Sequence, residues 1–559
     1  MLASSQSSSC STDRSSSAIS LIPDIGDSDA TVALYRQNEV EVEASQGEWQ
    51  CASPARFARF MLIAVLRAVE PLYQSGTIGS IPDDPLLVIF SFYVEESYKL
   101  YDPVVFGSIK ELEAWRLLVH VCRRWRNLVF SSPRHLNLRL VCTGRKRVRD
   151  KLGLWPTLPI VIDGVELNRY NKLPEQHVDR IVAALEHRDR VCQISFTSIP
   201  LILIPTFIEM MEESFPSLTH LYLNFNSEAE SPMLHSDSFL GGSAPHLRSL
   251  NLSGIPFPSL PTLLSTSKDL IELHLWRVPT SGYISPVAMA TCLSSLTRLE
   301  SLKLGLSPQS SHSSNHLPPS LTRIDLPTLT YFAFFGTNAH MEDLVAWINA
   351  PLLQDIVISF YLDPPFNISQ LNQFIGRVEN FKILHRAVVD IEDPARFPQF
   401  SLFEDPVDGA TLKLLVPCSL SEYQLLSLVA LSSSPSSPLR PSYFERLDIP
   451  NGFKPLEYRN DMEAVRWPEL LQPFTSTKNL YLGNRNAPYI ARVLQGLAVE
   501  GTVEVLPALQ HIFLQDCQQF EELSESIGTF IAARQLFGRP VAIHRWEGFQ
   551  KHDSQEEDD

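Results

Sequence analysis

The chain has 559 residues, of which 44% are hydrophobic and 19% charged, and its formal net charge is −17. This length allows more than one folded domain and a large core. The negative charge argues against nucleic acid or an anionic membrane as a general partner, because both repel an acidic protein. The expected partners are therefore proteins.

The eight cysteines are scattered, with no Cys-x-x-Cys pair and no histidines beside them at zinc-ligand spacing. This usage is typical of reduced intracellular cysteine. The sequence shows neither a signal peptide nor the roughly 18 to 20 apolar residues that a membrane span requires. We expect a protein of the cytoplasm or nucleus, with no membrane segment, metal or cofactor.

The two ends of the chain have compositions that disfavour folding. Residues 1–50 are Ser-rich and then acidic, and residues 549–559 are acidic. Such segments bury too little apolar surface to offset the entropy lost on ordering. They predict a disordered arm and a solvated tail.

The first expected helix starts near Asp83 or Asp84, either of which can cap it. Pro85 suits the first helical position, because that N–H has no partner there. The apolar residues that follow recur at helical spacing, and Leu87 widens their stripe: Leu86, Ile89, Phe90 and Tyr93.

A second helix is expected over residues 111–130. Its apolar residues follow helical periodicity: Leu118, Val121, Cys122, Trp125, Leu128 and Val129. Four arginines lie near Cys122, but its place on the apolar stripe favours a structural role over a reactive thiol. Two short helices expose more apolar surface than so small a unit can hide, which indicates a binding partner.

Together these segments carry the pattern Ile81-Pro82-Asp83-Asp84-x-Leu86-Leu87-x-Ile89-Phe90, then Trp115 and Val121-Cys122-Arg123-x-Trp125. The pattern resembles an F-box, specifically the F-box-like version abundant in fungal proteins, and the likeness extends to Ile160. It departs from the family in the long connection 95–110 and at Ile81, where many members have leucine.

The resemblance implies that residues 75–140 form a helical module that binds a Skp-type adaptor, and through it a cullin. Matching positions give the candidate adaptor-binding residues Ile81, Pro82, Leu86, Leu87, Ile89, Phe90, Val121, Cys122 and Trp125. The alternative is that several of them only hold the helices together.

From Val191 onward, the pattern Leu-x-x-Leu-x-Leu, with other apolar residues allowed, recurs at intervals of about 23 to 33 residues. Four instances are clear, beginning at Leu218, Leu247, Leu270 and Leu299. Weaker ones begin at Val191, Leu329, Leu353, Val378, Phe444, Thr477 and Leu509, and residues 400–440 are the least readable.

Each instance predicts a short strand, and the segments between, such as 341–349 and 487–497, have helical periodicity. We therefore expect an α/β fold: the small helical F-box-like module, then an irregular leucine-rich-repeat-like solenoid over residues 191–548. Its parallel strands carry helices or loops on the outer face. Residues 141–190 form a linker and N-terminal cap.

One face of such a sheet stays open to solvent and can bind a target protein. By alternation along each strand, this face displays Tyr222, Asn224, Asn251, His274, Trp276, Lys303, Tyr331, Phe335, Tyr481 and Phe513. The alternative is that some of them pack under loops. Asn226 and Cys517 fall where such repeats place a core Asn or Cys, so Cys517 is not expected to be a nucleophile.

Motifs for catalysis are missing: the sequence has no phosphate-binding Gly-rich loop, no Gly-x-Ser-x-Gly elbow and no His-Glu-x-x-His helix. His312 and His316 lie in a Ser-rich run and do not indicate a metal site. The basic residues Arg145, Lys146, Arg147 and Arg149 fit a solvated linker better than a nucleic-acid patch. No enzymatic activity is expected.

The leading hypothesis is a substrate receptor of an SCF-type ubiquitin ligase, whose repeat domain binds a protein destined for ubiquitin-dependent degradation. The competing hypothesis is a free-standing leucine-rich-repeat scaffold without a ligase role. A weaker third possibility is a nucleic-acid-associated factor that uses the basic linker.

Overall fold

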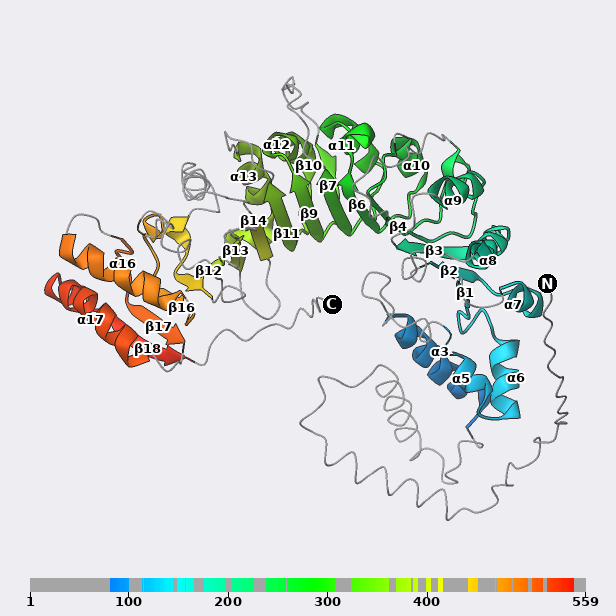
Figure 1. Ribbon diagram of the computed structural model, residues 1–559, viewed down its shortest axis with the longest axis horizontal. Coiled ribbons are helices and arrows are strands. Elements are labelled where there is room, and N and C mark those ends of the chain that lie inside the picture. Colours follow the sequence, from blue (N-terminus) through cyan, green and yellow to red (C-terminus); the bar gives the residue numbers. More distant parts are fainter. Residues whose placement is uncertain are drawn as a thin grey trace, which may run out of the picture. The chain divides into compact units, whose positions relative to one another are not determined.

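Figure 1 shows the computed structural model of the chain, which comprises two compact units, residues 1–100 and 101–559. The structure describes residues 81–99, 113, 115–143, 148–155, 157–164, 175–197, 203–224, 238–257, 259–306, 323–360, 368–383, 386–390, 399–403, 411–415, 441–450, 468, 471–484, 486–500, 505–515 and 520–546. The predicted arm and tail, the connection 95–110 beyond Lys99, Asn226, His312, His316, Cys517 and the basic residues at 145–147 lie outside these ranges.

In the first unit, the described residues form helix α3 (Asp83–Lys99). A helix at this point was expected, but Pro85 is its third residue and not its first. Asp83 and Asp84 lie in the first turn, where carboxylates complement the positive end of the helix dipole. Leu86 and Phe90 are fully buried.

The second unit opens with two helices, α5 (Trp115–Val119) and α6 (Arg123–Ser131). The prediction of one helix over 111–130 was therefore wrong. The amides of His120 and Val121 bond three residues back, to Leu117 and Leu118, which closes α5. Cys122 is then extended (φ −154°, ψ 171°) and caps α6, since its Sγ accepts a hydrogen bond from the Trp125 amide at 3.4 Å.

Two polar contacts fasten α5 to the start of the sheet. The indole Nε1 of Trp115 donates to the Arg139 carbonyl at 3.0 Å. The amide of Val141 donates to Oε1 of Glu113 at 3.2 Å, and Arg116 pairs with the same carboxylate. Because a buried carboxylate needs such partners, Glu113 fixes the start of α5 against β1.

The rest of the unit is built on a 16-stranded sheet, with the strand order β1-β2-β3-β4-β5-β6-β7-β9-β11-β14-β13-β12-β15-β16-β17-β18. Neighbouring strands are parallel, except that β13 runs antiparallel to β12 and β14. The strands are β1 (Leu140–Thr143), β2 (Ile160–Asp163), β3 (Val191–Thr197), β4 (His220–Asn224), β5 (Ser249–Ser253), β6 (Glu272–Val278), β7 (Ser301–Leu306), β9 (Tyr331–Gly336), β11 (Asp355–Phe360), β12 (Arg386–Asp390), β13 (Gln399–Phe403), β14 (Thr411–Leu415), β15 (Arg446–Ile449), β16 (Asn479–Leu482), β17 (His511–Gln515) and β18 (Ala542–Trp546).

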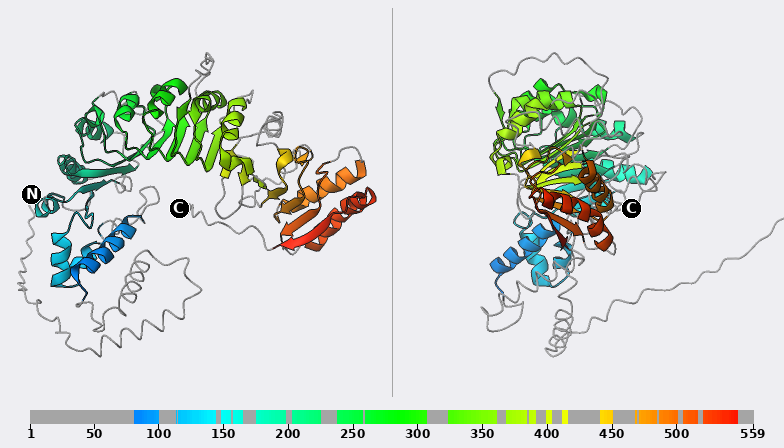
Figure 2. Two further views of the ribbon diagram at one scale, coloured as in Figure 1. Left: turned by 180° about the vertical axis from the view of Figure 1, so that it is seen from behind. Right: turned by 90° about the vertical axis from the view of Figure 1, so that its left-hand side faces the viewer.

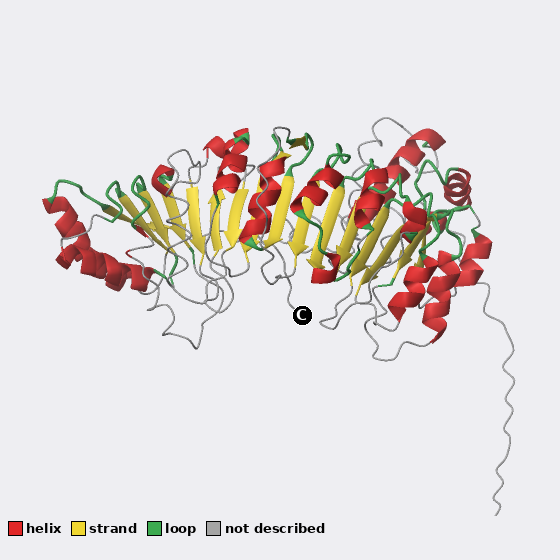
Figure 3. Cartoon of the chain, turned by 90° about the horizontal axis from the view of Figure 1, so that it is seen from above, coloured by secondary structure: helices red, strands yellow, loops and turns green. Residues whose placement is uncertain are grey.

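Helices connect most of the parallel strands and lie along one side of the sheet (Figures 1, 2 and 3). They are α7 (Val148–Leu154), α8 (Glu175–Leu185), α9 (Ile204–Met210), α10 (Leu260–Thr266), α11 (Pro286–Leu293), α12 (Asn338–Trp347), α13 (Ser369–Gly376), α16 (Ala487–Glu500) and α17 (Phe520–Leu536). Short 3₁₀ turns are η6 (Phe239–Gly242), η7 (Thr280–Gly282), η8 (Glu379–Ile383) and η9 (Pro441–Tyr443), and β8 (Ile324–Asp325) pairs with β10 (Ile348–Asn349). The expected strand-turn-helix unit is confirmed.

The core forms between the sheet and these helices, from apolar residues that stack from strand to strand. One row runs through register partners that are at most 1% exposed: Leu221, Leu250, Leu273, Leu302, Phe332 and Ile356. Each buried side chain of this kind contributes about 1.5–3 kcal/mol. No repeat could bury this face alone, so the stack itself is the stable unit.

Ten of the eleven predicted strand positions coincide with strands, and the one beginning at Val378 was wrong. Phe381 and Ile383 lie in η8, and β12 begins only at Arg386. The apolar spacing is satisfied equally well by a buried turn, so periodicity alone does not separate the two. Strands β1, β2, β8, β10, β12, β13, β14 and β18 were not predicted, and β1 and β2 extend the sheet into the segment expected to be a linker and cap. No described helix has both the length and the apolar character needed to cross a bilayer.

Candidate protein-binding surfaces

The adaptor-binding candidates on and before α3 divide into buried and exposed residues. Ile81, Leu86, Ile89 and Phe90 are at most 6% exposed, so they are core residues of the folded chain. Pro82 is exposed and Leu87 half-buried. The helix also exposes two apolar residues that the sequence pattern did not single out, Val88 at 49% and Phe92 at 61%.

Residues 88 and 92 are four apart on α3, so both side chains lie on one helix face. Their exposure was missed because the apolar residues of this segment nearly surround the helix, and spacing alone did not indicate which stripe is buried. The helix therefore presents two neighbouring apolar side chains, Val88 and Phe92, that remain accessible next to its buried stripe.

The candidates around α5 and α6 divide in the same way. Trp125 is 4% exposed and belongs to the core, while Val121 is 59% exposed and Cys122 is exposed. The expectation that Val121 and Cys122 lie on the apolar stripe of a continuous helix was wrong, because the chain breaks there. Leu117, which the sequence did not single out, is 63% exposed. The second unit thus presents Leu117 and Val121 as accessible apolar side chains at the end of α5.

All ten residues predicted on the open face of the sheet are half-buried, whereas the leucines that alternate with them are buried. Tyr222, Asn251, His274 and Lys303 are successive register partners on β4, β5, β6 and β7. The structure therefore brings the predicted residues of the central strands into one continuous row.

Beside this row, an aromatic pair is fitted around a glycine. Trp276 on β6 and Phe335 on β9 meet edge to face, with ring centroids 4.2 Å apart. Gly305 on the strand between them leaves room for the indole, since a Cβ there would lie 2.9 Å from Trp276 Cε3. Arg277, the residue after Trp276, has a positive φ of 49°, and the register between β6 and β7 shifts between Leu275 and Val278. A bulge thus positions Trp276.

The polar residues of this row and of the neighbouring row make few side-chain hydrogen bonds. His274 Nε2 is 3.1 Å from the Ser301 hydroxyl, and Ser249 donates to Glu272 at 2.8 Å. Burial, and then the Lys303 ammonium, lower the pKa of His274 to about 4, against the opposing Glu272 carboxylate. His274 is therefore neutral at pH 7. Lys303 Nζ lies 5.2 Å from the Tyr331 ring centroid, a cation–π contact.

The other two predicted residues, Tyr481 and Phe513, belong to a second group at the C-terminal end of the sheet. Their rings are parallel, with centroids 4.2 Å apart, and Phe513 stacks in turn on His544. The Arg446 guanidinium lies 3.9 Å from the Tyr481 centroid. This stack spans β15 to β18. Its outer members, Arg446 and His544, were missed because β15 carries only a weak repeat pattern and β18 was not predicted.

Asp448 on β15 belongs to the same group and has a fully buried carboxylate. Arg386 Nε donates to it at 2.6 Å, and Arg446 donates through Nε at 2.8 Å and Nη2 at 3.0 Å. Each guanidinium of the second group thus has a carboxylate partner, and its rings are stacked on one another.

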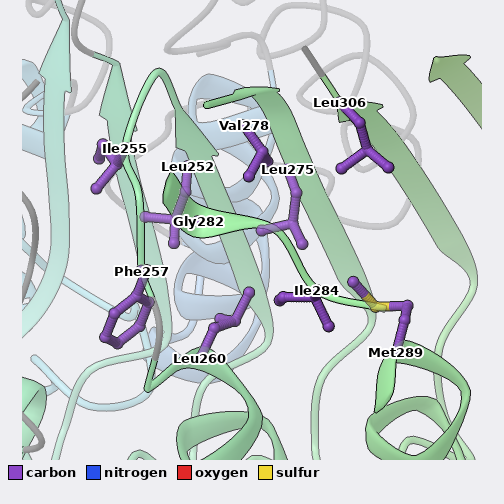
Figure 4. A pocket seen from close by; sticks show the side chains of 10 residues that line it. All are labelled: Leu252, Ile255, Phe257, Leu260, Leu275, Val278, Gly282, Ile284, Met289 and Leu306. Carbon is purple, nitrogen blue, oxygen red and sulfur yellow. The ribbon is translucent and has the colours of Figure 1, made fainter. Parts of the chain in front are cut away.

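A small apolar pocket lies between the sheet and the helices α10 and α11 (Figure 4). It is lined entirely by hydrophobic side chains and Gly282, including Leu252, Leu275 and Met289, and its volume is about 10 Å³. A space of that size barely admits a water molecule, and the side chains that line it are all apolar, so it is a packing gap and not a substrate site.

Within the described ranges, no group of three or more His, Cys, Asp and Glu side chains is placed to hold a metal ion. Cys142 and Cys292 are buried, and burial raises the pKa of the Cys292 and Cys192 thiols. Comparison of the sequence with protein-family models and with curated proteins finds no match.

Proposed function

We propose that this chain is the substrate receptor of an SCF-type ubiquitin ligase, present in the cytoplasm or nucleus. Its F-box-like helices bind a Skp-type adaptor, and through it a cullin, while the open face of the sheet binds the protein to be ubiquitinated. The chain itself contributes no catalysis and no cofactor. Its role is to hold the target close to the ligase, which raises the concentration of the target at the ligase.

The observation that carries this proposal is the exposure of large apolar side chains in the segments that resemble an F-box. Val88 and Phe92 stand on one face of α3, and Leu117 and Val121 stand at the end of α5. Apolar anchors on rigid helices are typical of protein interfaces, where a few such residues provide most of the binding energy.

The test is capture of the full-length chain by an immobilised, purified Skp-type adaptor. We expect Phe92→Asp and Leu117→Asp each to weaken capture about tenfold or more, since a lost anchor costs about 1.4 kcal/mol or more. Trp125→Ala is a poor test, because this buried side chain also supports folding.

A matched pair of variants controls for surface charge. Val88 is 49% exposed on α3, and Val287 is 47% exposed on α11, far along the chain. Val88→Asp should weaken capture, and Val287→Asp should leave it unchanged. If the native chain is not captured, or if both valine variants behave alike, the ligase-receptor proposal fails.

The second candidate function is a leucine-rich-repeat scaffold without a ligase role. The half-buried aromatic residues on the open face favour it, because they suit protein binding whether or not an adaptor is present. Failure of adaptor capture, together with an intact fold, would select this alternative.

A further inference from the structure

The open face carries two groups of residues: a central group of Trp276, Lys303, Tyr331 and Phe335, and the C-terminal group around Tyr481 and Phe513. The two groups differ in whether their charged side chains have partners of opposite charge. In the C-terminal group, Asp448 holds both Arg386 and Arg446, and each ring covers the next. In the central group, the Lys303 ammonium faces the Tyr331 ring and has no carboxylate within ion-pair distance among the described residues. The central group is therefore the one with capacity for a partner.

We infer that the open face over β6, β7 and β9 binds an acidic-and-apolar motif of a target protein: a carboxylate on Lys303, and a bulky apolar side chain against Trp276 and Phe335. This inference rests on the proposed target-binding role of the sheet. It adds the chemical class of the partner.

The charge pattern across the strands assigns the carboxylate to one row. Lys303 shares its row with neutral partners, Asn251, His274 and Ala333. The neighbouring row, two residues toward the strand N-termini, carries the acidic residues Glu272 and Asp355. A partner carboxylate is attracted by Lys303 and repelled by that second row.

The apolar contact belongs to the row on the other side of Lys303. Trp276 and Phe335 lie there with Gly305 between them, so the indole edge and the Phe ring form one surface across three strands. Rows on one face are two residues apart, about 6.6 Å. The partner's carboxylate and apolar group should have a similar separation, as at positions i and i+2 of an extended peptide.

The bulge supports a binding role for Trp276. Arg277 adopts a left-handed backbone conformation, which is unfavourable for a residue other than glycine, and the carbonyl of the adjacent Trp276 accepts a hydrogen bond from the Gly254 amide at 2.9 Å. A strained bulge that holds a large aromatic side chain on an open face is typical of a functional position.

The experiment selects a random 12-residue displayed peptide library on the immobilised full-length chain. We expect enrichment of sequences with Asp or Glu two residues from Phe, Trp, Leu or Met, by at least about tenfold over the input library. Lys303→Glu should invert the charge preference to Lys and Arg. Lys413→Glu, at a half-buried lysine in the same row on β14, is the matched control and should keep the native preference.

Two variants test the apolar contact. Trp276→Ala should abolish enrichment, and Gly305→Ala should weaken it by displacing the indole without removing it, with each fold checked by circular dichroism. No enrichment on the native chain, or the same sequences on native and Lys303→Glu proteins, overturns the inference. Self-association of the native chain that Trp276→Ala abolishes would assign this face to a second copy, and would overturn it too.

The adaptor capture experiment keeps the two proposals distinct. Charge-selective enrichment without adaptor capture would leave a target-binding scaffold. Adaptor capture with no enrichment would retain the ligase receptor and remove the acidic-and-apolar motif.

Discussion

Glu342 shows how a single buried carboxylate joins two helices of the solenoid. It lies on α12, is 6% exposed, and accepts hydrogen bonds from the amides of Gln370 at 2.7 Å and Leu371 at 2.9 Å on α13. Burial raises the pKa of Glu342 to about 7, although the two amides oppose the shift. The folded chain therefore holds a proton here more tightly than the unfolded chain does.

This shift predicts a pH dependence of stability. A carboxyl group whose pKa is raised on folding stabilises the protein fully below its unfolded pKa of 4.5, and that contribution is lost as pH rises through about 7. Relative to Glu342→Gln, the native chain should lose on the order of 2 kcal/mol between pH 5 and pH 8. Urea unfolding of both proteins at each pH measures the difference. Burial lowers the pKa of His340, also on α12, to about 4, but both proteins contain this residue and its contribution to the difference cancels. A pH-independent difference would contradict the assignment.

Cys122 offers a test that separates capping from adaptor contact. Because its Sγ accepts from the Trp125 amide, Cys122→Ser should preserve the cap, and Cys122→Ala should cost about 0.5–1 kcal/mol of unfolding free energy. Thermal unfolding of the two variants measures this cost. If Cys122→Ala weakens adaptor capture while Cys122→Ser does not, and both stay folded, the thiol position acts through the cap.

At the level of elements, the clean Leu-x-Leu segments predicted β4 to β7 because one face of each strand is buried and the other half-exposed. That alternation is missing from β1 and β2, whose residues are all buried, so they carry no period-two signal. The helix break at Cys122 was equally unreadable, because residues 117–121 are nearly all apolar and fit a continuous helix. The alternation of side chains along each strand predicted which residues lie on the open face. It could not predict the contacts of Lys303 or Asp448, because their partners lie on neighbouring strands that are distant in sequence.

The paired charges around β15 allow a matched comparison of buried and exposed acids. Asp448 is fully buried between Arg386 and Arg446, whereas Glu445 pairs with Lys478 while 53% of its side chain remains exposed. Asp448→Asn should cost about 3 kcal/mol, since both guanidinium groups lose their counter-charge. Glu445→Gln should cost about 1 kcal/mol or less. Urea unfolding midpoints measure both, and similar costs would show that β15 is not held by the buried pair.

On the scale of the second unit, each strand of the sheet is hydrogen-bonded to its neighbours in the order from β1 to β18. Stability in such an arrangement is a sum of repeat and nearest-neighbour contributions. The α5 attachment lies at β1, through Glu113 and Trp115, and the central open-face group lies at β6 to β9. Damage at one position should therefore stay local.

Leu302→Ala tests this locality. Leu302 is fully buried on β7, between β6 and β9, and its truncation should cost about 2–5 kcal/mol by opening a cavity. In hydrogen exchange, amides of β6, β7 and β9 should lose protection, while those of β1, β2, β16 and β17 keep theirs. The same variant should still be captured by the adaptor, because α5 is fastened six strands away. Uniform loss of protection along the chain would instead show that the sheet unfolds as one cooperative body, and adaptor capture would then fail together with the open face.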